Sequence, residues 1–223
     1  MAGRLFVVAT PIGNLEDITL RALRVLGEVA AIACEDTRQT LKLLNRYGIR
    51  KPLISYYQPR EGQRVPEIVR MLKEGRDVAL VSDAGTPGIS DPGFPLIRAA
   101  LKDGITVVPV PGPSAVATAL SAAGLPTHRF LFAGFPPPKR SGLMKCLEAL
   151  RSEEATLVFY LPTRRIADFL AAVVDVLGDR RVVIARELTK VHEEFLRGKA
   201  AELTATLGGR PLKGEATVLV EGI

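Results

Sequence analysis

The chain has 223 residues, of which 47% are hydrophobic and 24% are charged, as in ordinary globular proteins and unlike disordered or fibrous chains. Its apolar runs, such as Leu5–Ala9, are strand-sized and far short of the ~18 residues that cross a bilayer, so we expect no membrane span. A net charge of +6 is compatible with an anionic partner such as RNA but does not by itself indicate one.

The N-terminus reaches Pro11 and Gly13 directly after its first apolar run, without the long hydrophobic region and cleavage site of an export signal. Cys34 and Cys146 are far apart and form no C-x-x-C pair, which argues against a disulfide framework and a cysteine metal site. We therefore expect a cytoplasmic protein without a metal. Because 15 of the 30 Lys and Arg residues precede Gly124, the chain has no basic tail.

Short β-rich runs alternate with helix-spaced segments in the first half of the chain. The expected strands are Leu5–Ala9, Ala31–Cys34, Leu53–Tyr57, Val78–Ser82 and Thr106–Val110. The expected helices are Ile18–Val29, Thr37–Tyr47, Val65–Glu74, Phe94–Lys102 and Ser114–Ala123. This βα alternation predicts a mainly parallel sheet of five strands that is covered by helices.

After Gly124-Leu125-Pro126, which we interpret as a short linker, the α/β pattern starts again. The expected strands are Phe130–Ala133, Ala155–Tyr160, Arg181–Ala185, Glu193–Arg197 and Glu215–Glu221. The expected helices are Leu143–Leu150, Ile166–Leu177 and Ala200–Leu207. The sequence therefore predicts two α/β domains, residues 1–124 and 125–223.

Three segments that directly follow expected strands are crowded with Gly and Pro: Thr10–Asn14, Ser82–Gly93 and Pro111–Ala115. In open α/β sheets, ligands bind beyond the carboxyl ends of the strands. Gly lets the backbone approach a ligand closely and Pro fixes the loop, so such segments suit a preorganised small-molecule site. For each of the two shorter segments taken singly, tight turns alone are the better interpretation, whereas for Ser82–Gly93 a ligand site is the better one.

The loops also indicate which ligand to expect. Neither a G-x-G-x-x-G nor a G-x-x-x-x-G-K-[ST] motif is present, so a dinucleotide site and a P-loop are not indicated. The segment Ser82–Gly93 carries Asp83 and Asp91 and no Lys or Arg, which suits a cationic or hydroxyl-bearing ligand better than a phosphate. A sulfonium cofactor with ribose hydroxyls fits this description.

Five segments of the chain match a known family. They are Ala9–Leu15, Glu35–Arg38, Ser82–Gly93, Pro111–Ser114 and Arg186–Lys190. With them, nearly the whole chain resembles the tetrapyrrole-methylase superfamily of S-adenosylmethionine-dependent methyltransferases. Within that superfamily it is most similar to the ribosomal RNA small subunit methyltransferase I family, which methylates the ribose 2′-hydroxyl of a cytidine in 16S rRNA. Porphyrin-modifying relatives carry Gly-Asp-Pro where this chain has Gly85-Thr86-Pro87.

The resemblance implies two α/β domains of the tetrapyrrole-methylase type, with a mainly parallel five-stranded N-terminal sheet, a mixed C-terminal sheet and the cofactor in the cleft between the domains. The cofactor-binding residues implied are Pro11, Asp83, Gly85, Thr86, Pro87, Ile89, Ser90, Ser114, Ala115 and Leu161. The substrate-binding residues implied are Asn14, Arg38, Arg186 and Lys190. The implied partner is 16S rRNA or the small ribosomal subunit, and no membrane.

A general base would help because a sugar hydroxyl is a weak nucleophile. The candidates are Glu35, Asp83, Glu187 and His192, with Lys190 as a further catalytic candidate, and the sequence does not choose among them. Glu35 precedes a helix start, where carboxylates also serve as caps. Arg186–Lys190, which we expect to meet the RNA backbone, can instead form a buried ion-pair network.

The chain departs from the family pattern at Leu161 and Arg164, where relatives usually carry Glu and His. Longer members also continue past the last strand into a small helical domain, so we expect a homodimer to supply further surface for RNA. Two alternative functions stay open at this point. One is methylation of a porphyrin-like small molecule, and the other is RNA binding by a catalytically inactive relative.

Overall fold

The computed structural model describes residues 2–58, 61–207 and 212–223. The chain divides into two compact units, Met1–Ser114 and Ala115–Ile223. The boundary precedes helix α5 (Ala115–Ala123), whereas the sequence led us to place it after Gly124. The physical reason is that α5 packs on strands β10 (Glu215–Val220) and β8 (Arg181–Arg186) of the second unit.

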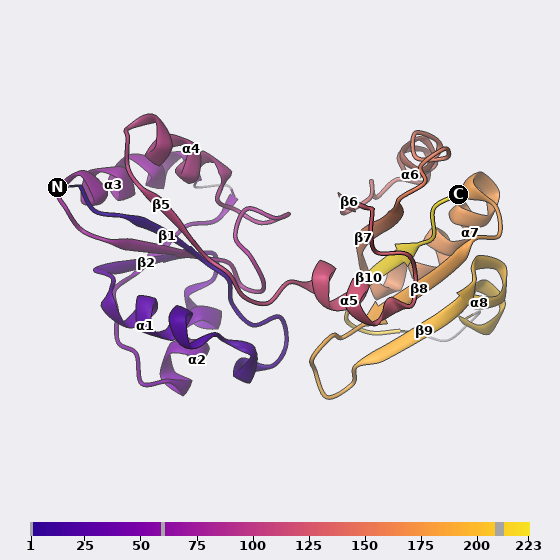
Figure 1. Cartoon of the computed structure of the whole chain (residues 1–223), viewed down its shortest axis with the longest axis horizontal. Helices are drawn as coiled ribbons and strands as arrows, with labels where there is room; N and C mark the ends of the chain where they lie inside the picture. The colour runs from indigo at the N-terminus through magenta and orange to yellow at the C-terminus, as the bar shows by residue number, and fades with distance from the viewer. Residues whose placement is uncertain (1, 59–60, 208–211) are drawn as a thin grey trace. The chain divides into compact units, whose positions relative to one another are not determined.

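The first unit contains the parallel sheet predicted from the sequence. Its strands are β1 (Leu5–Val8), β2 (Ala31–Cys34), β3 (Leu53–Ser55), β4 (Val78–Val81) and β5 (Val107–Val110). They are arranged in the order β3-β2-β4-β1-β5, and every neighbouring pair is parallel. Strands β1, β2 and β5 are labelled in Figure 1. All five strands therefore end at the same edge of the sheet.

Helices cover both faces of this sheet. They are α1 (Leu20–Glu28), α2 (Thr37–Arg46), α3 (Glu61–Lys73) and α4 (Phe94–Lys102). Helices α1 and α2 pack on the face that carries Val8 and Ile32, while α3 and α4 pack on the face that carries Leu5 and Leu80. Because neighbouring strand residues point to opposite faces, a strand buried on both sides must be apolar throughout.

The second unit is built around a mixed sheet with the strand order β6-β7-β10-β8-β9. The strands not yet bounded are β6 (Phe130–Gly134), β7 (Thr156–Pro162) and β9 (Glu194–Lys199). Strands β6 and β7 are parallel, and the other neighbouring pairs are antiparallel. The mixed sheet expected for the C-terminal part is therefore confirmed (Figure 1).

Helices α6 (Arg140–Glu148), α7 (Ile166–Leu177) and α8 (Ala200–Leu207) form one apolar core with a single face of this second sheet. Helix α5 packs against β10 and β8. Among the residues that the structure describes, no helix combines the length and hydropathy that a membrane crossing requires.

Candidate functional site

The carboxyl ends of β1 and β4 form the centre of the candidate site. The two strands are hydrogen-bonded neighbours, but α1, which follows β1, packs on one face of the sheet and α4, which follows β4, packs on the other. Neighbouring strands whose connections leave toward opposite faces mark the position where open α/β sheets bind ligands. The two Gly- and Pro-rich loops predicted to form a site therefore meet at this position.

A pair of reciprocal hydrogen bonds ties these two loops together. The Thr10 amide donates to the Gly85 carbonyl at 2.9 Å, and the Gly85 amide donates to the Thr10 carbonyl at 3.0 Å. The Thr10 hydroxyl is buried and donates to the Ser82 carbonyl at 3.0 Å. These bonds fix the start of the long loop against the end of β1.

The long loop after β4 depends on left-handed backbone conformations. Gly85 and Gly88 have φ values of 80° and 81°, which glycine adopts without steric cost. Ser90 has φ 62°, an unusual value for a residue with a side chain. Such conformations cost free energy, persist when the surrounding structure holds them, and cluster at ligand sites.

The far end of this loop is held by Glu61, at the start of α3. Its carboxylate oxygen accepts a hydrogen bond from the Gly93 amide at 2.9 Å. The Tyr56 hydroxyl is buried and has no hydrogen-bond partner among the described residues. Burial raises the pKa of Tyr56, and the negative charge of Glu61 raises it further. Glu61 has no recognisable signal in the sequence, because its partner is a backbone amide 32 residues away.

Two of the proposed bases, Glu35 after β2 and Asp83 after β4, lie in the first unit. Desolvation raises the pKa of Glu35, and the negative charge of Asp83 adds to this effect. Desolvation also raises the pKa of Asp83, whose carboxylate accepts a hydrogen bond from the Asp36 amide at 2.9 Å. No cation within the described part of the chain pairs with either carboxylate. This end of the sheet can therefore hold a positively charged ligand or accept a proton.

Asp36 has a structural role. It caps α2 by accepting from the Arg38 amide at 2.8 Å, and its carboxylate pairs with the Arg38 guanidinium at 2.8 Å. The hydrogen bonds from Arg38 hold the pKa of Asp36 at about 2. The Arg38 side chain is 86% exposed, so it remains accessible, and its substrate-binding role stays a prediction.

Several other predicted residues take part in local structure. Asn14 accepts a hydrogen bond from the Glu16 amide at 3.1 Å and so caps a short 3-10 helix. Pro11 and Pro87 are buried, whereas Ile89 is exposed. The Thr86 carbonyl accepts from the Ile89 amide at 3.3 Å. Ligand binding by these residues is not tested by these contacts and stays a prediction.

The loop after β5 approaches the end of β1 closely. A Cβ atom at Gly112 would lie 3.1 Å from the Cβ of Ala9, which explains a glycine at this position. Ser114 ends the first unit and Ala115 opens α5 in the second. Three predicted ligand-binding loops thus gather at one edge of the first sheet.

In the second unit, the segment Arg186–Lys190 forms ion pairs within itself and with β9. The Arg186 guanidinium pairs with Glu194 at 3.1 Å, and the Lys190 ammonium pairs with Glu187 at 2.9 Å. Burial opposes ionisation of Glu187, but the hydrogen bonds from Lys190 and the Glu215 amide outweigh it and lower its pKa. The ion-pair interpretation of this segment therefore has direct structural support, and contact with RNA stays a prediction.

The same segment has a constrained backbone. Glu187 and Thr189 have φ values of 50° and 64°. A Cβ atom at Gly214 would overlap the Glu187 carboxylate, so Gly214 provides the space that this side chain occupies. Gly214 has no recognisable signal in the sequence, because its role depends on Glu187, which precedes it by 27 positions and meets it only in the fold.

Two further predicted residues of this unit differ in exposure. The Leu161 side chain is buried in the core beneath α7, so contact with a ligand would have to come from its backbone. His192 is exposed. Its role as a base stays a prediction.

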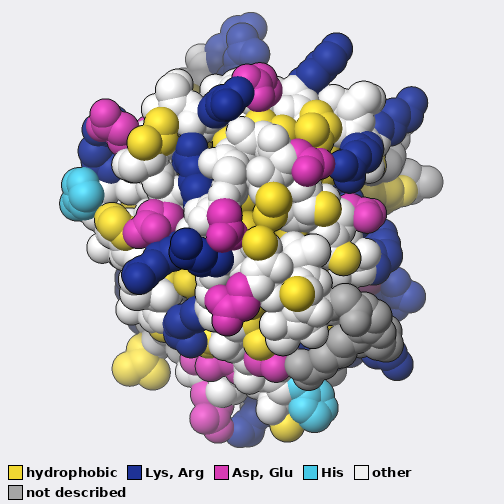
Figure 2. Space-filling view, turned by 90° about the vertical axis from the view of Figure 1, so that its right-hand side faces the viewer, with side chains coloured by type: hydrophobic (Ala, Val, Ile, Leu, Met, Phe, Trp, Pro, Cys, Tyr) yellow, Lys and Arg dark blue, Asp and Glu magenta, His cyan; other side chains and the backbone are white. Residues whose placement is uncertain are grey.

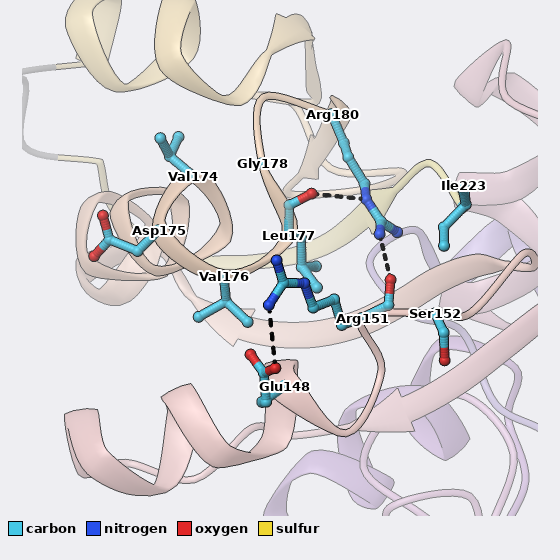
Figure 3. A pocket seen from close by; sticks show the side chains of 11 residues that line it. Glu148, Arg151, Ser152, Val174, Asp175, Val176, Leu177, Gly178, Arg180 and Ile223 are labelled. Atoms are coloured by element: carbon cyan, nitrogen blue, oxygen red, sulfur yellow. Dashed lines mark hydrogen bonds and ion pairs between the residues drawn. The ribbon is translucent and has the colours of Figure 1, made fainter.

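A cavity of about 880 Å³ lies beside the end of α7 (Figure 3). The charged side chains that line it form hydrogen bonds and ion pairs with each other and with the backbone. The Arg180 guanidinium donates to the carbonyls of Leu177 at 3.0 Å and Arg151 at 2.6 Å. Arg151 in turn pairs with Glu148 at 3.3 Å. The bond to Leu177 satisfies a carbonyl at the C-terminal end of α7, and the bond to Arg151 satisfies a carbonyl in the turn after α6. Arg180 therefore has a structural role.

Comparisons with known proteins agree with this architecture. Residues 4–204 match the family of Tetrapyrrole (Corrin/Porphyrin) Methylases. The chain is 46% identical to Ribosomal RNA small subunit methyltransferase I of Thermotoga maritima, with 99% of each protein covered. It is 50% identical to the protein of that name from Pseudomonas aeruginosa, over 99% of this chain and 79% of the relative.

Solved structures with lower sequence identity share the fold. A diphthine synthase superposes with a TM-score of 0.75 at 15% identity, over 99% of this chain and 90% of that one. A uroporphyrin-III C-methyltransferase from Thermus thermophilus, solved in complex with S-adenyl homocysteine, superposes with a TM-score of 0.66 at 20% identity. That alignment covers 98% of this chain and 97% of the other.

Proposed function

Because the chain belongs to the tetrapyrrole methylase family, we propose that it transfers a methyl group from S-adenosylmethionine to the ribose 2′-hydroxyl of a cytidine in 16S rRNA. The observation that carries this proposal is the full-length similarity, at 46–50% identity, to relatives that are named as ribosomal RNA small subunit methyltransferases. It favours rRNA over a porphyrin-like acceptor.

The residues at the end of the first sheet suit this cofactor. S-adenosylmethionine supplies a methyl group on a positively charged sulfur, which becomes a neutral thioether on transfer. The carboxylates of Glu35 and Asp83 stabilise positive charge, since neither forms an ion pair with a described cation. The backbone at Gly85 and Gly88 can approach a ligand closely because neither residue has a side chain.

The acceptor hydroxyl must lose its proton as the new carbon–oxygen bond forms. A base works best when its pKa is close to the operating pH, and the pKa values of Glu35 and Asp83 are both raised. Either carboxylate can therefore take this proton. Neither of them forms an ion pair with a described cation. Preorganised loops hold the reactants in place, which can contribute ~7–11 kcal/mol in favourable cases.

The charges of the chain suit binding of RNA over a broad surface. Figure 2 shows Lys and Arg side chains scattered over one face and interleaved with carboxylates. We propose that a homodimer doubles the number of phosphate contacts. Binding to single-stranded RNA should then weaken with salt, with a log–log slope of about −0.7 for each phosphate contact. A monomeric variant should show a shallower slope.

The decisive experiment incubates the protein and isotopically methyl-labelled S-adenosylmethionine with small ribosomal subunits from a strain that lacks the enzyme. The rRNA is then digested and its nucleosides are identified by mass spectrometry. We expect the label on 2′-O-methylcytidine. Label on a base, or label transferred only to a tetrapyrrole in a parallel reaction, would contradict the proposal. RNA binding without any transfer would support an inactive RNA-binding protein instead.

A further inference from the structure

An aromatic patch is exposed at the β6 edge of the second sheet. Its members are Phe130, Phe132, Phe135 and Tyr160. The Tyr160 ring centroid lies 4.9 Å from that of Phe132 and 5.4 Å from that of Phe135. Phe130 is 50% exposed and Phe135 is 60% exposed. Aromatic residues make up only 5% of the chain, which has no Trp, so a cluster of four with two strongly exposed rings indicates a binding surface.

The strand pattern directs the patch away from the core. On β6, Leu131 and Ala133 pack against the core beneath α6 and α7, so Phe130 and Phe132 lie on the opposite face. Helix α5 covers part of that face by packing on β10 and β8. The aromatic patch lies on β6 and β7, at the other edge of the sheet. Figure 1 labels these two strands.

The loop that carries Phe135 is held rigidly. Arg165 donates hydrogen bonds to the carbonyls of Pro136, at 3.0 Å, and Pro137. From the other side, α6 packs so closely that a Cβ atom at Gly142 would lie 2.9 Å from the Cβ of Pro137. The prolines restrict the backbone further. The exposed Phe135 ring is therefore presented by a fixed scaffold and is not a feature of a loose loop.

Two cations follow the carboxyl ends of β6 and β7, which lie at the same edge because the two strands are parallel. Lys139 follows the proline loop, and Arg164 lies on the short 3-10 helix Thr163–Arg165 that also provides Arg165. Within the described part of the chain, neither Lys139 nor Arg164 has an ion-pair partner. An exposed aromatic ring next to unpaired cations is an arrangement by which proteins stack unpaired bases and contact the adjoining phosphates.

We propose that the aromatic patch stacks an unpaired base of the RNA substrate, while Lys139 and Arg164 contact neighbouring phosphates. This inference rests on the proposed function, because it assumes that the acceptor is RNA. A second copy of the chain is the competing occupant, because aromatic residues and Arg are enriched at protein–protein interfaces. Two unpaired cations, one of them a Lys, favour an anionic partner, since Lys is depleted at such interfaces. The patch would select single-stranded over paired RNA, because the bases of a duplex are already stacked.

The test measures binding of the full chain to a fluorescently labelled, cytidine-rich single-stranded RNA and to a duplex of equal length. A length of about 12 nucleotides matches one binding site of a single-strand-binding protein. Phe135→Ala should weaken single-strand binding roughly 5- to 150-fold, which corresponds to about 1–3 kcal/mol for one stacked base. Phe135→Tyr should retain binding and Phe135→Leu should not, since only Tyr can stack. Leu101→Ala removes an equally exposed apolar side chain from α4 and serves as the control.

The possible outcomes separate this inference from the proposed function. If Phe135→Ala binds single-stranded RNA as tightly as the wild type, while the wild type methylates 16S rRNA, the inference is wrong and the proposed function stands. A variant that instead becomes monomeric at unchanged RNA affinity would identify the patch as an interface between copies. A loss confined to S-adenosylmethionine affinity would assign it to the cofactor. A wild type that neither binds nor methylates RNA refutes both proposals.

Discussion

The two units of this chain treat their charged loops in opposite ways. In the first unit, all strands are parallel, so the loops that follow them converge at one edge and bring Glu35 and Asp83 together, and neither carboxylate forms an ion pair with a described cation. In the second unit, Arg186 and Lys190 form ion pairs with the carboxylates of Glu194 and Glu187, so the charges of this segment neutralise one another. The pKa of Glu35 is accordingly raised, while that of Glu187 is lowered.

This difference between the pKa values indicates which unit carries the reactive groups and which unit uses its charges for stability. A carboxylate with a raised pKa costs stability in its charged form and is therefore a candidate for function. A carboxylate with a lowered pKa contributes to stability in its charged form. We thus expect substitutions in the first unit to affect activity and equivalent substitutions in the second to affect folding.

The largest expected effect concerns the base. Glu35→Gln should reduce the rate of methyl transfer by about 10²- to 10⁴-fold, the usual contribution of a general base, if Glu35 takes the proton. Asp83→Asn provides the same test for the other carboxylate of the first unit. Glu187→Gln is the matched variant of the second unit and should change the rate less than about tenfold. Single-turnover assays on small subunits measure all three. A slower reaction with Glu187→Gln than with both others would locate the base in the second unit.

The next effect concerns cofactor binding. Gly85→Val places a branched side chain on a residue with φ 80° that faces the Ile12 side chain, and strain at such a position costs about 1–3 kcal/mol. We expect S-adenosylmethionine binding to be lost in calorimetry, a decrease of at least about 100-fold. Gly104→Val is the control, because Gly104 has φ 68° but no neighbouring atoms within 4 Å. Equal cofactor affinity in the two folded variants would overturn the assignment of the loop.

A third prediction tests whether the second unit uses its charges for stability. Gly214→Ala would displace the Glu187 carboxylate and break its bonds to Lys190 and the Glu215 amide. We expect Tm to fall by roughly 4–10 °C with little change in S-adenosylmethionine affinity. Gly178→Ala carries a similar conformational cost at φ 82° without a neighbouring atom within 4 Å. If both variants lose the same amount of stability, the contact with Glu187 adds nothing.

The smallest expected effect is a difference in the pH dependence of stability. The folded-state pKa of Glu35 is raised, so its charged form lowers stability as pH rises through the interval between its ordinary and its raised pKa. Glu35→Gln should therefore raise Tm at pH 7 by about 1–3 °C. For Glu187 the folded-state pKa is lowered, so its contribution is present above the ordinary pKa and is lost as pH falls through the folded-state value.

Glu187→Gln should consequently lower Tm at pH 7 by about 1–3 °C. The difference for Glu35→Gln should disappear once pH falls below the ordinary Glu pKa of about 4.3, and that for Glu187→Gln should shrink only as pH falls through its lowered folded-state pKa. Thermal unfolding followed by circular dichroism between pH 3 and 8 measures these shifts. Shifts of the same sign in the two variants at pH 7 would contradict the contrast between the units.

The sequence allowed the strands to be predicted closely, because a strand buried on both faces must be a continuous apolar run. Val78–Val81 and Ala31–Cys34 are examples. It also indicated the loops after β1 and β4 as candidate ligand loops, because ligands bind beyond the carboxyl ends of strands in open α/β sheets. That these two strands are neighbours is known only from the fold. The sequence did not indicate that α5 belongs to the second unit, since this depends on packing against β10, almost one hundred residues later.

The candidate site was predictable in its residue types but not in its contacts. Glu35 and Asp83 follow strands and carry unpaired charge, which sequence reasoning could anticipate. The hydrogen bond from Gly93 to Glu61 and the space that Gly214 provides for Glu187 both depend on tertiary structure. Such roles are carried by backbone groups, which have no signature in the sequence.

The paired hydrogen bonds between Thr10 and Gly85 have a dynamic consequence. Each loop supplies both a donor and an acceptor to the other, so neither loop can detach while the other keeps its backbone satisfied. The two loops should consequently open in one cooperative event. In native-state hydrogen exchange, the amides of Thr10 and Gly85 should exchange with the same opening free energy, and a ligand that contacts only one loop should slow the exchange of both.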